Sequence, residues 1–308
     1  MSMVASEDRS AAVANFVKLG LALGVETATF ESELGRFEGY LRDEVIFKYS
    51  LLDGFTWSYS LQDFLLTKLF PNKIGTYIDV GANIGLVVIP VAEKGGIQCY
   101  AFEPEPSNYA LLRRNIVAHH VESLIQTYPI ALFSKKTTLP FEICYRNFGD
   151  HRIRPNQPAN VQEAYREAER KVIAVQAERL DDVLDASQLE KPIVMKVDIQ
   201  GAEVQFFKGA TKFLPFVDYL VIEYSPYMIQ YLGDNPESIF EIVQQFPFAS
   251  TVDTFDRVRS VEIALKPIEQ VLESVRIMFD LKHIDPEQAV DIICSRTSVL
   301  PSALHSYR

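Results

Sequence analysis

Short apolar runs alternate with amphipathic stretches over most of the chain, and this pattern predicts an α/β fold. The runs are rich in β-branched and aromatic residues, as is typical of strands, while the stretches between them space their apolar residues as a helix does. Because the runs are apolar on both faces, they predict a mostly parallel sheet with helices on both sides. The predicted strands are 76–80, 98–103, 124–132, 192–198 and 218–224, and the clearest helices are 107–120 and 201–214.

The C-terminal part of the chain adds two strand patterns around one more helix. The strand patterns are 248–255 and 289–296, and the helical pattern is 267–279. The whole series therefore predicts a seven-stranded sheet in a domain of residues 71–308.

A polar segment, residues 146–171, interrupts this series between its third and fourth strands. It is long for a connection in a compact domain, and such segments are commonly lids, binding loops or excursions without fixed structure. Its role stays open at this point.

The first 70 residues show helical spacing instead of strand patterns. Apolar side chains recur at helical intervals between Leu61 and Leu69, and Pro71 ends that element. We therefore predict an N-terminal helical extension over residues 1–70. Its most apolar stretch, 11–25, is too short and too polar for a membrane span, so we expect a packed amphipathic helix. These helices can cover the sheet or pack against a second subunit, so a homodimer is one expectation.

Composition narrows the class of partner. The 308 residues are 48% hydrophobic, which is ample for a sizeable core, and they carry a net charge of −11 with a pI near 5.0. This acidity argues against binding to phosphate backbones or anionic membranes, so no nucleic-acid partner is expected. The three cysteines are scattered and none lies in a C-x-x-C pair, which predicts reduced thiols in a cytoplasmic protein.

One stretch, "TYIDVGANIG" at residues 76–85, places an acid and two glycines where a buried strand should turn into a helix. In an open parallel sheet, ligands bind beyond the carboxyl ends of the strands at such turns. Asn83 stands where a dinucleotide turn needs its middle glycine, which disfavours a pyrophosphate and leaves an adenosyl ligand open. Glu103 ends the next strand, 24 residues after Asp79, where a carboxylate can accept hydrogen bonds from both ribose hydroxyls. The alternative is a plain turn beside a solvated strand end.

Three separated motifs resemble the FkbM family of S-adenosylmethionine-dependent methyltransferases, within the class I Rossmann-like methyltransferase fold. They are "YIDVGANIG", "FEPEPSN" and "MKVDIQGAE…FKGA", and the resemblance extends from about Tyr77 to Arg296. It implies S-adenosyl-L-methionine as cofactor and O-methylation of a sugar, glycan or other small natural product. The family often carries Glu where this chain has Gln200, which leaves the role of position 200 open. The resemblance assigns the cofactor site to Asp79, Gly81, Ala82, Asn83, Gly85, Glu103, Pro104 and Asn108.

Methyl transfer to a hydroxyl needs in-line alignment and a base to remove the proton, and three residues are candidates for that base. Asp198 ends a predicted strand and should face the same crevice as Asp79, or it caps the following helix. His151 has an ordinary pKa of about 6.5 and is either a base or an exposed loop residue. Glu223 ends an apolar strand and can bind the acceptor, serve as the base or bond to a loop. No residues show metal-ligand spacing, so no metal is expected.

Other classes of function stay open. A nucleic-acid methyltransferase can use this fold, although base methylation commonly uses an Asn or Asp before Pro-Pro where this chain has "DIQG". A non-catalytic protein can retain the fold for nucleoside binding. A nicotinamide-dependent enzyme is the weakest alternative because Asn83 replaces the middle glycine.

Overall fold

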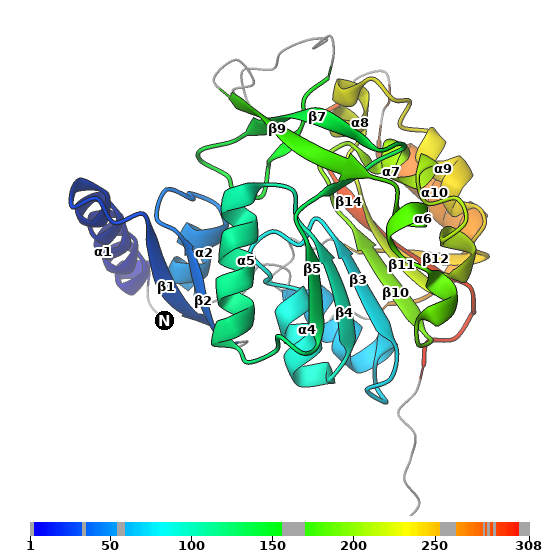
Figure 1. Cartoon of the computed structure of the whole chain (residues 1–308), viewed down its shortest axis with the longest axis horizontal. Coiled ribbons are helices and arrows are strands. Elements are labelled where there is room, and N and C mark those ends of the chain that lie inside the picture. The colour runs from blue at the N-terminus through cyan, green and yellow to red at the C-terminus, as the bar shows by residue number, and fades with distance from the viewer. Residues whose placement is uncertain are drawn as a thin grey trace, which may run out of the picture.

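A mixed eight-stranded sheet with helices on both faces forms the centre of the protein (Figure 1). The computed structural model describes residues 3–301 except 33–34, 54–58, 156–169, 253–262, 280, 282–283 and 286–287. The predicted α/β class and class I Rossmann-like fold are confirmed. The strands of this sheet are β3 (Thr76–Val80), β4 (Gln98–Phe102), β5 (Ile125–Tyr128), β10 (Ile193–Val197), β11 (Tyr219–Tyr224), β12 (Phe248–Val252), β13 (Lys266–Pro267) and β14 (Val290–Ser295).

The sheet order is β13-β12-β14-β11-β10-β3-β4-β5. The five strands from β11 to β5 pair in parallel, whereas β14 is antiparallel to both β11 and β12, and β13 is antiparallel to β12. The predicted count of seven strands therefore misses β13, which has two residues and is too short to form a pattern. From β3 the chain adds β4 and β5 on one side, and from β10 it adds β11 on the other side. The topological switch point therefore lies between β3 and β10.

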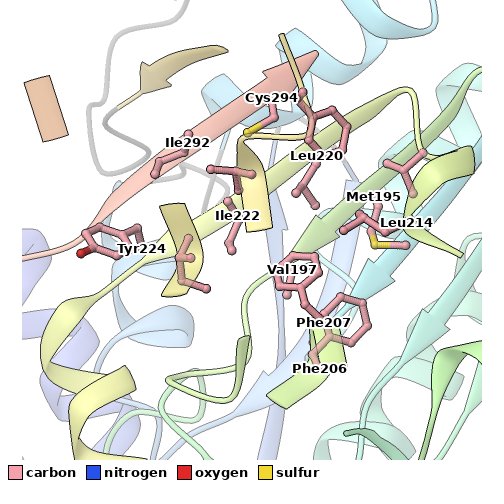
Figure 2. Close-up of a cluster of buried hydrophobic side chains, with 14 of the residues drawn as sticks. Met195, Val197, Phe206, Phe207, Leu214, Leu220, Ile222, Tyr224, Ile292 and Cys294 are labelled. Carbon is pink, nitrogen blue, oxygen red and sulfur yellow. The ribbon is translucent and has the colours of Figure 1, made fainter. Parts of the chain in front are cut away.

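Side chains of the central strands alternate between two cores. Tyr77 and Val194 face a core shared with α4 (Val88–Gly95) and α5 (Pro106–Ala118). Met195, Leu220 and Ile222 face the other core (Figure 2), which they share with α7 (Glu203–Lys208), α9 (Ser238–Val243) and α10 (Ile268–Met278). This double burial explains why the strands are apolar at nearly every position.

The N-terminal extension departs from the helices that we predicted. It contains α1 (Met3–Ala22), α2 (Ile46–Asp53), α3 (Tyr59–Phe64) and a π-helix (Leu65–Leu69), but residues 27–32 and 35–40 form the two strands of an antiparallel hairpin. The prediction was wrong there because Phe30 and Phe37 are cross-strand partners that are buried on one side of the hairpin, where the first strand contacts α2 and the second contacts α5. The hairpin strands are β1 (Thr27–Ser32) and β2 (Gly35–Tyr40).

A second, four-stranded sheet lies at the top of the view in Figure 1, beside α8 (Pro226–Leu232). Its order is β6-β9-β7-β8. Sequence patterns missed β7 because Pro140 lies inside it, and a proline argues against a strand. The predicted strand 124–132 divides between β5 and this sheet. The strands are β6 (Ala131–Leu132), β7 (Thr137–Ile143), β8 (Arg152–Ile153) and β9 (Lys171–Glu178).

Shorter elements complete the described fold. The predicted helix 201–214 is reduced to α7, which ends at Lys208, and a 3-10 turn at Leu214–Phe216. The remaining turns of helix are α6 (Leu180–Val183) and Ala186–Gln188. Among the described residues, no helix is long and apolar enough to cross a membrane. Residues 156–169 of the polar segment and 253–255 of a predicted strand lie outside the described residues.

Candidate active site

One cavity of about 280 Å³ lies at the carboxyl ends of the parallel strands, at the switch point. Residues from the sheet, the polar segment and the N-terminal extension line it. The sequence-predicted residues that the cavity brings together are Asp79, Gly81, Ala82, Asn83, Glu103, Pro104, Asn108, His151, Asp198 and Glu223.

Gly85 is the predicted site residue that does not line this cavity. Its φ is +95°, and a Cβ there would lie 2.6 Å from Ile89 Cδ1 and 2.8 Å from Leu112 Cδ1. Gly85 therefore lets α4 start close to α5, and its predicted contact with the cofactor is not supported.

Gly81 brings the backbones of two turns into contact. A Cβ at this position would lie 2.0 Å from the carbonyl oxygen of Asp198, and the φ of +89° also favours glycine. The amides of Gly81 and Ala82 both donate to the Phe102 carbonyl at 3.0 Å. The glycine turn after β3 is thus fixed against the strand ends on both sides.

Glu103 ties the glycine turn to the end of β4. Its Oε2 accepts from the Asn83 amide and its Oε1 from the Glu105 amide, both at 2.9 Å. Burial raises the pKa of Glu103 to about 8, although these two hydrogen bonds favour the carboxylate. Each oxygen of a carboxylate has a second lone pair, so Glu103 can still accept two hydrogen bonds from a ligand.

The start of the polar segment closes over the glycine turn. Asn83 and Asn108 each donate a side-chain hydrogen bond to the Phe148 carbonyl at 3.0 Å. The Phe148 ring stacks on Tyr40 of β2 with centroids 4.7 Å apart. Our sequence reasoning missed Phe148, because nothing in a sequence marks a carbonyl that will accept two side-chain amides.

A row of ionisable side chains crosses four adjacent strands on one face of the sheet. Lys196 is the register partner of Asp79, and Glu223 is the register partner of Asp291. All four residues line the cavity. We did not predict Lys196 or Asp291, although a charged residue within an apolar strand is the signal that could have identified both.

Lys196 is the cation of this row. Its Nζ lies 3.0 Å from Asp198 Oδ2 and 3.8 Å from Asp79 Oδ1. Burial opposes its charge, but the two carboxylates raise the pKa of Lys196 above its ordinary value. Burial and the nearby Asp198 raise the pKa of Asp79 to about 6 against the effect of Lys196. Oδ1 of Asp79 is buried without a hydrogen-bond partner, so it is an acceptor that a ligand can satisfy.

Asp198 does not cap a helix, so that alternative was wrong. The residue before α7 is Ala202, which has no side-chain cap, and Glu203 holds the turn by accepting from the Ile199 and Gly201 amides at 3.1 and 3.3 Å. Asp198 instead contacts Lys196 and Gln200. Burial alone would raise the pKa of Asp198, but these partners lower it below the ordinary value. Asp198 is therefore an ionised carboxylate at neutral pH.

Glu223 lies on the other side of Gln200 and behaves differently. Its Oε2 accepts from Gln200 Nε2 at 2.8 Å. Burial and the negative charges of Asp198 and Asp291 raise the pKa of Glu223 well above its ordinary value. Of the two acids, Glu223 therefore holds a proton more readily, which makes Asp198 the better candidate for the base.

His151 is poorly suited to the role of base that we predicted. Its Nδ1 accepts from the Cys144 amide at 3.0 Å, so the proton of the neutral ring lies on Nε2. Burial and, to a lesser extent, Arg170 lower its pKa to about 3. Nε2 is buried without a hydrogen-bond partner, and the ring can offer a donor to a ligand instead.

Buried ion pairs hold His151 in place. The Arg152 side chain is fully buried, 3.6 Å from both Glu142 and Asp150, with its guanidinium 4.5 Å from the centre of the Tyr231 ring. Arg170 pairs with Asp150. An unpaired ion here would be costly to bury, so this network fixes the loop that carries His151. Arg152 therefore has a structural role.

The residues of the cavity fit the cofactor that the resemblance implies. Glu103 retains lone pairs for ribose hydroxyls, and Asp79 has a buried acceptor without a hydrogen-bond partner. Val45, Ile46 and Leu61 of the N-terminal extension add apolar wall. Within the described residues, no group of three or more His, Cys, Asp or Glu side chains is arranged to hold a metal ion.

Comparison with known proteins shows the family. The family described as Methyltransferase FkbM domain matches residues 79–260, which is more than half of the chain. Methyltransferase sdnD of Sordaria araneosa is 30% identical over 155 residues, which cover 43% of this chain and 59% of that protein. Hexuronic acid methyltransferase AglP of Haloferax volcanii is 21% identical over 179 residues, covering 58% of this chain and 65% of that protein. The chain thus spans less than two thirds of each of these relatives.

Solved structures add a weaker likeness. The crystal structure of a Methyltransferase FkbM from Methylobacillus flagellatus KT superposes with a TM-score of 0.35 at 17% identity, covering 56% of this chain and 36% of that one. The family match confirms the resemblance read from the three motifs. This chain therefore belongs to the FkbM family of S-adenosylmethionine-dependent methyltransferases.

Proposed function

We propose that this protein transfers a methyl group from S-adenosylmethionine to a hydroxyl of a sugar, glycan or other small-molecule acceptor. The observation that carries the proposal is the cavity at the switch point, whose lining includes the glycine turn, Glu103 and Asp198. In this fold a ligand bound by the first turn reaches the ends of the neighbouring strands. A cofactor and an acceptor can therefore meet beside Asp198.

Glu103 and Asp79 are the acceptors that we assign to the cofactor. The two ribose hydroxyls donate to Glu103, and Asp79 offers to the amino acid part its Oδ1, which accepts no hydrogen bond within the protein and lies 3.8 Å from Lys196 Nζ. Ala82, Asn83, Pro104 and Asn108 complete this wall, with Gly81 allowing the close backbone approach. When bound, the cofactor supplies the methyl group and its sulfonium leaving group.

Asp198 is the residue that we assign as the base. It is ionised, it lines the cavity, and Lys196 holds it at 3.0 Å. A hydroxyl becomes a competent nucleophile when a positioned carboxylate removes its proton, which typically contributes ~10²–10⁴-fold to the rate. His151 Nε2 is placed to donate a hydrogen bond to an acceptor oxygen.

The acceptor class rests on the relatives and on the chemistry of the site. One relative is a hexuronic acid methyltransferase, and a sugar ring offers hydroxyls for Asp198 and an apolar face for the aromatic wall at Phe148. We also propose that the protein acts in the cytoplasm. A homodimer and a boundary near residue 70 stay predictions, although the extension shares a core with α4 and α5.

The test is cofactor binding followed by transfer of label. Calorimetry should show binding of S-adenosylhomocysteine, and methyl-labelled cofactor should place its label on a hydroxylated acceptor in a panel of neutral, amino and uronic sugars. Absence of cofactor binding would refute the proposal. Label on RNA, with binding that weakens steeply with salt, would establish the nucleic-acid alternative. Binding without transfer to any acceptor, unchanged in Asp198→Ala, would favour a non-catalytic protein.

A further inference from the structure

Gln200 occupies an unusual position between two carboxyl groups. Its Nε2 donates to Asp198 Oδ1 and to Glu223 Oε2, each at 2.8 Å. Its backbone has φ +53°, the left-handed conformation that non-glycine residues rarely adopt. Gln200 also lines the cavity. Such a backbone persists only where the surrounding structure determines it.

The fixed turn around Gln200 explains how this conformation is held. A Cβ on the next residue, Gly201, would lie 2.2 Å from the Met228 carbonyl oxygen, so the chain passes tightly against α8. Glu203 accepts the Ile199 and Gly201 amides on either side of Gln200. The turn therefore directs the Gln200 side chain back toward the strand ends.

In this chain, an amide side chain bridges the two carboxyl groups. Its two N–H groups can each donate to one carboxyl group, whereas a third carboxyl would add repulsion between like charges. Asp198 also contacts the Lys196 ammonium, while Glu223 faces Asp291 across the β11–β14 pair. The charges on the two sides of the Gln200 amide are therefore unequal.

We propose that Gln200 is a positioning residue whose amide holds Asp198 and Glu223 in one fixed pair, with Asp198 as the anion that receives the acceptor proton. The inference rests on the function proposed above and adds to it a role for position 200. The Lys196 ammonium beside Asp198 and the Asp291 carboxylate beside Glu223 give the pair its direction. The surroundings of the two acids support this direction, because they lower the pKa of Asp198 and raise the pKa of Glu223.

The deciding variant is Gln200→Glu, with Gln205→Glu as its matched control. Gln205 lies on α7, and its Nε2 donates to both oxygens of Asp234 at 2.9 Å, but it does not line the cavity. Gln200→Glu places a third acid beside Asp198 and Glu223, and Gln205→Glu places a second acid beside Asp234. Only the first should disturb the proposed site.

The first readout is the titration of the carboxyl groups, measured by infrared difference spectroscopy without cofactor or acceptor. The variant Glu223→Gln identifies the signal of Glu223. Gln200→Glu should move the titration of the Asp198–Glu223 pair upward by about one pH unit or more, because a third carboxyl disfavours the anion. Gln205→Glu should leave it unchanged. A pair that titrates alike in the wild type and in Gln200→Glu would overturn the inference.

The second readout is the pH dependence of turnover. The acid limb of kcat should shift upward in Gln200→Glu by the same amount, while the affinity for S-adenosylhomocysteine stays close to wild type. Gln200→Ala removes the bridging amide and adds no charge, so it should shift the acid limb of kcat in the same direction by a smaller amount. If Gln200→Glu does not fold, Gln200→Ala tests the inference in its place. Failure of methyl transfer itself would refute the proposed function alone, because the infrared titration needs no turnover.

Discussion

Two turns meet at the switch point of this sheet, and they share a backbone conformation but differ in their chemistry. Each follows a buried parallel strand, each starts near an acid at the strand end (Asp79 or Asp198), and each has a non-glycine residue with positive φ. Those residues are Asn83, with φ +51°, and Gln200, with φ +53°. A glycine in each turn, Gly81 or Gly201, permits close backbone contact.

The difference lies in what the two side-chain amides do. The Asn83 amide donates to the Phe148 carbonyl, so it fastens the polar segment to the sheet. The Gln200 amide donates to two carboxyl groups, so it organises charges inside the cavity. The same strained backbone conformation therefore supports the fold at Asn83 and, in our proposal, proton transfer at Gln200.

The contact between the two turns should be the most sensitive feature. Gly81→Ala should destabilise the fold by about 3 kcal/mol or more, because its Cβ would overlap the Asp198 carbonyl. Gly96→Ala is the control, since Gly96 also has a positive φ but open space around it, and it should cost only about 1–2 kcal/mol. Urea unfolding of both variants measures the difference. Equal losses would show that conformation, not contact, decides at Gly81.

The acid of the second turn should control the rate. Asp198→Asn should lower kcat by ~10²–10⁴-fold, since the hydroxyl loses its base, while S-adenosylhomocysteine binding stays close to wild type. Steady-state kinetics and calorimetry separate the two effects. Asp234→Asn, which changes an acid outside the cavity that binds Gln205 and Lys208, should leave kcat unaltered. A full rate in Asp198→Asn would move the base elsewhere.

The acid that supports the first turn should control affinity. Above pH 8, where Glu103 is ionised, Glu103→Gln should weaken cofactor binding by about 1.5–3 kcal/mol, because hydrogen bonds to a charged acceptor are lost. The expected kcat at saturating cofactor is near wild type, opposite to Asp198→Asn. Calorimetric titration gives the affinity. If Glu103→Gln bound the cofactor normally and lost its rate, the cofactor and acceptor assignments of the two turns would have to be exchanged.

Glu103 should also make cofactor binding depend on pH. Burial raises its pKa to about 8 in the free protein, so it is mostly protonated at pH 7, whereas ribose hydroxyls donate to the ionised form. Binding should therefore tighten as pH rises toward 8, by up to about tenfold per unit, and level off above. Glu103→Gln should lose this dependence. An affinity that falls as pH rises would contradict the assignment.

Relief of strain at Asn83 should have the smallest effect. Asn83→Gly loses the hydrogen bond to Phe148 but gains a residue suited to positive φ, so its stability should change by less than about 1 kcal/mol. Asn83→Ala loses the same bond and keeps a Cβ in the left-handed region, so it should be the less stable variant. Urea unfolding should order the two. The reverse order would show that φ is not strained there.

Sequence patterns predicted the position of a residue in the fold well where its neighbours along the chain decide its environment. Asp79 and Glu103 follow buried apolar runs, so their places at adjacent strand ends could be read directly, and the fold class followed from the alternation of strands and helices. The antiparallel strands 27–32 and 35–40 escaped sequence prediction because Phe30 and Phe37 are buried where these strands contact α2 and α5, which are tertiary contacts.

The chemistry of the site depends on contacts between segments that are far apart in the sequence. Lys196 and Asp291 join the cavity because their strands lie next to β3 and β11, and strand order is not written in any one segment. His151 ceased to be a good base because one backbone amide, that of Cys144, occupies its Nδ1. Protonation depends on burial and on charges brought from distant parts of the chain, and the sequence by itself therefore names acids and bases without fixing which of them holds the proton.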